Sequence, residues 1–177
     1  MTSLDPKAVA SAPKRALSGV AYRNQARGYD PRSGEGARRF GGRFNPPRSF
    51  PTLYLCTTRA CVVAELTRQA SRQGIQVGDL LPRELWKIEI ALTSVLDLTD
   101  DAVPDVVGVA HADLVQEDHQ LTQQIGEAAY EHQFQAIRTP SATGVDEVLA
   151  IFPENLAGAV LQVERIETWS ETNDLPS

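Results

Sequence analysis

The sequence predicts one α+β domain, built on a mixed, mostly antiparallel and bent sheet with about three helices. Segments with strand patterns outnumber those with helical patterns by about six to three, without the regular strand–helix alternation of a parallel α/β fold. With 177 residues, of which 42% are hydrophobic and 23% charged, the chain is long enough to bury a core of its own.

Alternating or short apolar runs indicate the strands. The clearest lies at 85–92, where apolar side chains alternate with Lys87 and Glu89, as in a half-buried strand. On the same grounds, strands are expected at 17–23, 52–56, 85–92 with a continuation at 95–98, 134–138, 147–152 and 159–166.

The clearest helix is expected at 59–73. Thr57 or Thr58 offers a hydroxyl for the N-cap, and Gly74 suits the left-handed residue that commonly ends a helix. Glu65 falls on the flank of the apolar stripe, so its carboxylate can reach a cleft beside the core. The alternative is an ordinary surface glutamate that pairs with Arg68 or Gln69.

Two further helices and the ends of the domain complete the expected layout. A short helix is expected after Pro104 and a longer one at 121–132. Residues 1–16, rich in Ala, Ser, Pro and Lys, are expected to form a mobile tail, and residues 168–177 a polar, frayed one. The folded domain is therefore predicted over 17–167.

The charge is distributed unevenly along the chain. The net charge is −6, yet residues 14–48 hold nine basic and two acidic residues, and the remainder holds 8 basic and 21 acidic ones. A basic block on an acidic protein favours local anion binding over binding of nucleic acid by the whole surface. A merely solvated basic face is the alternative.

Several classes of protein are disfavoured. The chain has no apolar run of 18 residues and no apolar stretch near its start, so neither a membrane span nor a secretory signal is expected. Cys56 and Cys61 are expected to be reduced, partly buried thiols of a cytoplasmic protein. His111, His119 and His132 show no ligand spacing, so no metal site is expected.

The strongest candidate for a binding site is the segment 33–65. It begins with glycines, which allow a close approach of the backbone to a ligand, and with arginines, which suit phosphate or carboxylate. The pair Pro46 and Pro47 stiffens the exit from this loop, which leads into a strand and a helix.

The segments SGEGARRFGGRFNPP, LYL, VVAE, AIRTPSA and EVLAIF resemble the RES-domain family, the toxin half of bacterial RES–Xre toxin–antitoxin pairs. The resemblance covers roughly residues 22–152, within the expected domain. It implies a fold similar to the mono-ADP-ribosyltransferase toxins and cleavage of the nicotinamide–ribose bond of NAD+, by hydrolysis or phosphorolysis. NAD+ would then be the substrate, and no other cofactor is expected.

By position, the resemblance implies Glu65 and Arg43 as catalytic residues and Arg23, Tyr54 and Ser141 as substrate-binding residues. A fixed carboxylate stabilises the positive charge that develops on the ribose during cleavage. The guanidinium groups suit the pyrophosphate, and the Tyr54 ring and hydroxyl suit stacking and a ribose. The Ser141 hydroxyl would bind the nicotinamide amide or its ribose.

The chain departs from the family pattern at two positions. Phe44 stands where the family often has Trp, which keeps an aromatic side chain. Asn24 stands where some relatives carry an aromatic residue, whose stacking role would be lost here or taken by Tyr29 or Tyr54.

The expected function is therefore depletion of NAD+ by a type II toxin that a cognate Xre-type antitoxin neutralises, with water and phosphate both open as acceptors. An ADP-ribosyltransferase that modifies a macromolecule is the main alternative. A polyanion-binding module is a third hypothesis, which the acidic remainder of the chain disfavours. Family resemblance further implies a possible homodimer within a larger complex, with no direct binding of nucleic acid or membrane.

Overall fold

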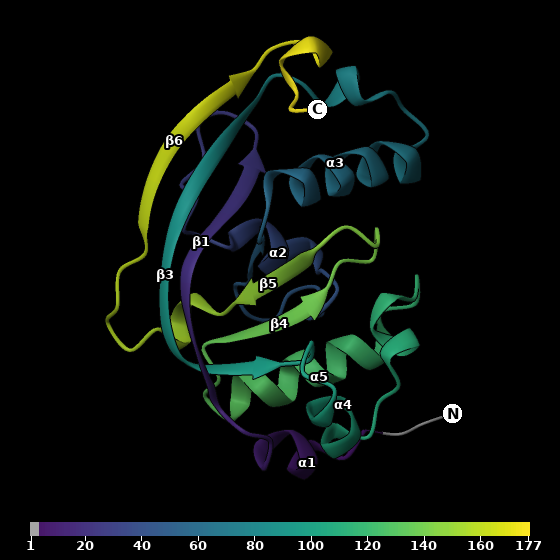
Figure 1. Ribbon diagram of the computed structural model, residues 1–177, viewed down its shortest axis with the longest axis vertical. Coiled ribbons are helices and arrows are strands. Elements are labelled where there is room, and N and C mark those ends of the chain that lie inside the picture. Colours follow the sequence, from purple (N-terminus) through teal and green to yellow (C-terminus); the bar gives the residue numbers. More distant parts are fainter. Residues whose placement is uncertain (1–3) are drawn as a thin grey trace.

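The computed structural model describes residues 4–177, in which six strands form one sheet in the order β1-β2-β5-β4-β3-β6. Every strand pair is antiparallel except β3–β4, and β1 also pairs with β3. Figure 1 shows how strongly β3 and β6 curve along one side of the molecule. These features confirm the predicted α+β class. The strands are β1 (Arg15–Gln25), β2 (Leu53–Cys56), β3 (Arg83–Asp97), β4 (Ala136–Pro140), β5 (Glu147–Ile151) and β6 (Gln162–Trp169).

Four of the α-helices lie at the two ends of the curved sheet, and α2 lies between them (Figure 1). Figure 1 shows α3 at one end, near the C-terminus, and α1, α4 and α5 at the other. The three expected helices are present, and α1 and α2 are additional. The α-helices are α1 (Pro6–Ala10), α2 (Glu35–Phe40), α3 (Arg59–Gln73), α4 (Ala102–Val107) and α5 (Gln120–Glu131), and the 3-10 turns are η1 (Val77–Leu80), η2 (His111–Val115), η3 (Pro153–Asn155) and η4 (Thr172–Asp174).

Helix α3 has the predicted limits. The Thr58 hydroxyl accepts a hydrogen bond from the Cys61 amide, and Gly74 ends the helix in the left-handed region at φ 69°. Both are local signals, a cap that satisfies a free amide and a residue without a Cβ, so the sequence was enough to define them.

The start of the chain differs from the expected mobile tail. Asp5 caps α1 by accepting a hydrogen bond from the Lys7 amide, and the side chain of Val9 is fully buried. Ala12, also buried, joins the same apolar cluster before β1 begins. Two small apolar side chains therefore fix a segment whose composition resembles a tail. Residues 1–3 of the expected tail lie outside the described residues.

The end of the chain also differs from expectation. Strand β6 extends to Trp169, whose side chain is fully buried and whose Nε1 donates to a Glu167 oxygen at 2.8 Å. A large aromatic side chain that is removed from water stabilises the end of this strand, so the fold continues past residue 167. The turn η4 follows within the segment expected to fray.

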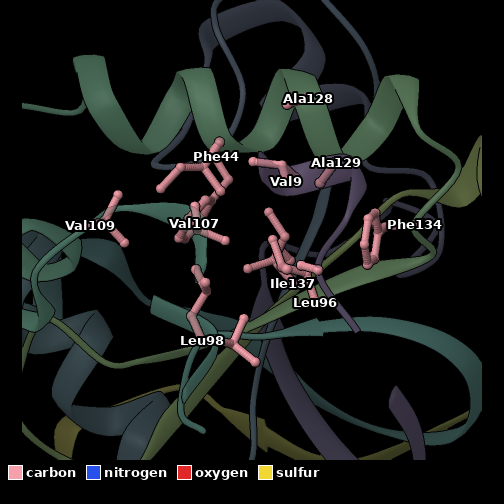
Figure 2. Packing of buried hydrophobic residues seen from close by; sticks show 14 of the residues in the cluster. Val9, Phe44, Leu96, Leu98, Val107, Val109, Ala128, Ala129, Phe134 and Ile137 are labelled. Atoms are coloured by element: carbon pink, nitrogen blue, oxygen red, sulfur yellow. The ribbon is translucent and has the colours of Figure 1, made fainter. Parts of the chain in front are cut away.

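The largest apolar cluster lies between the sheet and the helices α1, α4 and α5. Figure 2 shows Phe44 among Val9, Val107 and Ala129, although Phe44 belongs to the glycine–arginine loop. The Phe44 side chain is fully buried, so the core anchors the loop at this residue. None of the helices in residues 4–177 is long and apolar enough to cross a membrane.

Candidate active site

A cleft of about 620 Å³ lies between α2, α3, the start of α5 and strands of the sheet. Arg23, Arg43, Tyr54 and Glu65 all line it. The pairing of β1 with β2 explains part of this arrangement, because Tyr22 lies opposite Cys56 and brings the two strand ends together. Four side chains that are far apart in the sequence therefore meet in one cavity.

Ser141 contacts the same site from outside the cleft. It is buried outside the lining of the cleft, and its Oγ donates a hydrogen bond to Glu65 Oε1 at 2.7 Å. The Ser141 Oγ also lies 2.6 Å from Thr143 Oγ1 and accepts a bond from the Thr143 amide at 3.2 Å. In this arrangement the serine holds the carboxylate, a contact that the family resemblance did not imply.

Glu65 is half-buried on α3, with its carboxylate tied to Ser141. The alternative of a surface pair with Arg68 is not what the structure contains, because Arg68 forms its ion pair with Glu117. The carboxylate therefore has a fixed position at the edge of the core, facing a cavity, as a group that stabilises developing positive charge requires.

Arg23 is held rigidly at the end of β1. Its Nη1 donates to the carbonyl oxygen of Tyr54 at 3.0 Å and its Nε to Gln25 Oε1 at 3.2 Å. Burial and, to a smaller extent, the charge of Arg83 lower the pKa of Arg23 to about 10. The guanidinium therefore remains charged at neutral pH, in an environment where an anion would relieve its desolvation.

Arg43 connects the glycine-rich loop to the segment around η2. Its Nη1 donates to the carbonyl oxygens of Leu114 and Gln116, both at 3.0 Å. Burial and the neighbouring Arg68 lower the pKa of Arg43, while Glu65 acts in the opposite direction. Arg43 and Glu65 are therefore close enough to influence each other, as two groups of one site should be.

The hydroxyl of Tyr54 forms hydrogen bonds to the glycine–arginine loop. It donates to Asn45 Oδ1 and accepts from the Phe44 amide, both at 2.8 Å. Burial raises the pKa of Tyr54, so the hydroxyl stays protonated. Gly42 lies against the ring, where a Cβ would come within 2.6 Å of it. The ring lines the cleft as expected, but the hydroxyl that we had assigned to a ribose is already engaged.

Helix α5 fixes the other side of the loop, which the sequence did not indicate. Thr122 Oγ1 donates to the carbonyl oxygen of Arg43 at 2.6 Å, and Gln123 Nε2 donates to that of Gly42 at 3.0 Å. Because both carbonyl groups are hydrogen-bonded to α5, the chain at Gly42 and Arg43 has a defined orientation.

Asn45 and Gly126 complete this support. Asn45 is fully buried, and its Nδ2 donates to the carbonyl oxygen of Ala37 at 2.7 Å. Gly126 lies so close to Phe44 that a Cβ would come within 1.6 Å of the Phe44 carbonyl oxygen. The one available signal was a glycine inside a helix, which is unfavourable there unless packing requires it.

Of the two tyrosines that we expect could replace the missing aromatic at Asn24, Tyr54 lines the cleft and Tyr29 does not. Asn24 Oδ1 accepts a hydrogen bond from Arg83 Nε, and Tyr29 is not among the lining residues. Phe40, at the end of α2, lines the cleft and is 77% exposed. Phe40 thus adds an exposed aromatic side chain to the cleft, alongside Tyr22 and the Tyr54 ring.

Cys56 and Cys61 lie where β2 meets α3, as expected. Both are buried and unbridged, with their sulfurs 2.6 Å apart. The contact with Cys61, together with burial, raises the pKa of Cys56. A protonated thiol is a poor nucleophile, so Cys56 contributes an apolar surface to the cleft.

Comparison with known proteins decides the family. A family model described as the RES domain matches residues 13–174. The chain belongs to the RES domain family. This confirms the predicted family and extends the matched region beyond both expected domain boundaries.

The relatives include curated enzymes and a solved complex. The chain is 33% identical to "NAD(+) phosphorylase MbcT" of Mycobacterium tuberculosis (strain ATCC 25618 / H37Rv) over 150 residues, or 84% of this chain and 81% of that protein. A protein of the same strain described as a probable NAD(+) phosphorylase is 29% identical over 161 residues, or 90% and 76% of the two chains. The crystal structure of the M. tuberculosis MbcT–MbcA toxin–antitoxin complex matches with a TM-score of 0.83 and 29% identity, covering 93% of this chain and 91% of that one.

Proposed function

We propose that this RES-domain protein is an NAD+ phosphorylase and the toxin of a toxin–antitoxin pair. One observation carries the proposal: the carboxylate of Glu65, fixed by Ser141, faces a cleft that Arg23 and Arg43 also line. The likeness to proteins described as NAD(+) phosphorylases supports phosphate as the acceptor, which the sequence motifs left open.

Cleavage of the nicotinamide–ribose bond needs one carboxylate but no general acid to protonate the leaving group. The bond between the ribose carbon and the nicotinamide nitrogen breaks, and its electron pair goes to the nitrogen, so nicotinamide leaves neutral. Positive charge develops on the ribose, and the Glu65 carboxylate stabilises it. An oxygen of dianionic phosphate then bonds to the same carbon, which gives ADP-ribose 1-phosphate without removal of a proton.

The remaining residues of the site bind and orient the substrate. Arg23 is charged and desolvated, and an anionic pyrophosphate is the part of NAD+ that suits such a group. Arg43 brings a second charge beside Glu65, where it can hold the substrate close to the carboxylate. The Tyr54 ring offers a flat surface to the substrate, while its hydroxyl keeps the loop in place.

A cognate antitoxin is the expected partner, as in the MbcT–MbcA complex. Within this proposal the antitoxin is of the Xre type, and the toxin acts in the cytoplasm as part of a larger assembly that can include a homodimer. Co-expression of the cognate antitoxin should restore growth to cells that express this chain, and the two proteins should purify together.

The decisive experiment is incubation of the purified protein with NAD+, with and without phosphate, followed by mass spectrometry of the products. ADP-ribose 1-phosphate is expected, whereas free ADP-ribose would indicate hydrolysis and a mass increase on a macromolecule would indicate transfer. Replacement of Glu65 by Gln should lower kcat by about 100-fold or more, because a fixed charge that stabilises the transition state is lost.

The matched control is Glu89→Gln, an exposed carboxylate on β3 outside the cleft. It should keep the parental rate, and both variants should unfold at the parental temperature. A Glu65→Gln protein that consumes NAD+ at the parental rate would remove the basis of the proposal.

A further inference from the structure

Helix α3 contributes charged side chains to the cleft besides that of Glu65. Arg68 and Arg72 follow it by three and seven residues, and all three side chains line the same cavity. Residues at this spacing share one face of a helix, and Arg68 begins about 4.5 Å further along the helix axis than Glu65. A single helix face thus presents a carboxylate followed by two guanidinium groups.

His119 faces the same group of charges from the start of α5. It lines the cleft, and its Nε2 is buried without a hydrogen-bond partner among residues 4–177. Burial lowers the pKa of His119, and the nearby charges of Arg43 and Arg72 lower it further. The imidazole is therefore neutral at neutral pH, and a buried polar nitrogen remains available to a ligand in the cavity.

One exposed carboxylate, that of Glu117, offsets part of the charge of these two guanidinium groups. Glu117 forms an ion pair with Arg68 and a looser one with Arg72 at 3.7 Å, and its side chain is 69% exposed. The Arg68 side chain is 18% exposed, but the carboxylate of the pair lies in water, where salt screens it and the pair contributes little to stability. Glu117 thus occupies a position that a second anion can take.

A second pair of guanidinium groups lies on the strands β1 and β3. Arg23 on β1 and Arg83 on β3 both line the cleft and are close enough for the charge of Arg83 to lower the pKa of Arg23. The cavity therefore contains one group of cations on the strands and one on α3, and Arg43 of the loop lies close to the second group. Two separate groups of cations suit a reaction between a dinucleotide and a free oxyanion, because each anion can then have guanidinium partners of its own.

We propose that Arg68, Arg72 and His119 form the site for the attacking phosphate, and that Glu117 occupies this site when phosphate is absent. The inference rests on the proposed phosphorylase function and names the residues that bind its second substrate. Phosphate held one helical turn from Glu65 is placed beside the carbon whose bond to nicotinamide breaks. Its oxygen forms the new bond to that carbon, as in the step described above.

The test is the kinetics of Arg68→Gln and Arg72→Gln with phosphate varied at saturating NAD+. Each variant should raise the KM for phosphate by about tenfold or more, because one charged hydrogen-bonding group is lost, and should leave the KM for NAD+ within about twofold. Glu117→Gln should change the KM for phosphate in the opposite direction. The matched control is Arg59→Gln, on the first turn of the same helix, which is also ion-paired to a glutamate but lies outside the cleft.

Binding of phosphate, measured by ³¹P NMR line broadening in the presence of ADP-ribose, separates this inference from the proposed function. A wild-type protein that binds phosphate but forms no ADP-ribose 1-phosphate would contradict the function and leave the site in place. Arg68→Gln and Arg72→Gln proteins that bind phosphate as tightly as the Arg59→Gln protein, or that change only the KM for NAD+, would overturn the inference.

Discussion

The two walls of the cleft are built on different physical principles. We call residues 41–47, supported by α5, the loop wall, and residues 65–72 of α3 the helix wall. In the loop wall, the buried Thr122 and the half-buried Gln123 donate hydrogen bonds to backbone carbonyl groups. In the helix wall, Arg68 and Arg72 bond the exposed carboxylate of Glu117. The first wall is fixed, whereas the second can exchange its partners.

The difference follows from the cost of leaving polar groups unpaired. A buried group that loses its partner carries its full desolvation penalty, so the contacts of the fully buried Asn45 persist. An exposed ion pair has water and salt as ready substitutes. Glu65 combines the two situations, since its helix belongs to the exchangeable wall but Ser141 fixes its carboxylate from a buried position. The fixed loop wall suits recognition of NAD+. The helix wall, whose arginines can exchange their ion-pair partners, suits binding of a second, mobile anion.

The largest expected effect comes from disturbing the loop wall at Gly126. In Gly126→Ala the new Cβ would come within 1.6 Å of the Phe44 carbonyl oxygen, so either α5 or the loop must move. We expect the free energy of unfolding to fall by about 3 kcal/mol, measured by urea denaturation. Gly36→Ala is the control, since Gly36 also lies in a helix but no atom lies within 4 Å of its Cβ position. Equal stability of the two variants would show that the loop wall is not tightly packed.

A smaller effect is expected when only the hydroxyl of Tyr54 is removed. Tyr54→Phe leaves Asn45 Oδ1 and the Phe44 amide without their partner, which should lower the free energy of unfolding by about 2 kcal/mol. Hydrogen exchange at the Phe44 amide should become faster. Tyr29→Phe, at a tyrosine that is 69% exposed, should change neither measurement. If Tyr54→Phe matches this control, the hydroxyl is not what holds the loop.

The sequence predicted the helix wall better than the loop wall. The limits of α3 follow from Thr58, Gly74 and an apolar stripe, all of which are local signals. The position of Glu65 beside the core follows from the same stripe. Arg68 and Arg72 could have been found in this way too, because they follow Glu65 at helical spacing and share its face.

The loop wall depends on contacts that no local pattern encodes. The hydroxyl of Thr122 bonds a carbonyl group 79 residues earlier in the chain, so only the tertiary fold brings the two together. The same holds for Ser141, 76 residues from Glu65 in the sequence. Family resemblance implied a place for this serine in the site, but its hydrogen bond to Glu65 forms only because the fold brings the residue after β4 to α3. The helix α1 was missed because its few apolar residues give too short a pattern.

The smallest effect is expected from Ser141, and it distinguishes a residue that positions Glu65 from one that binds NAD+. Ser141→Ala removes the donor to Glu65 Oε1, so the carboxylate is less well fixed, and kcat should fall by about tenfold, equivalent to about 1.4 kcal/mol. Because Ser141 lies outside the lining of the cleft, the KM for NAD+ should stay constant. Ser71→Ala, at an exposed serine on α3, should change neither constant. A raised KM for NAD+ with an unchanged kcat would instead mean that the serine contacts the substrate, and that Glu65 is held in place by the packing of α3 alone.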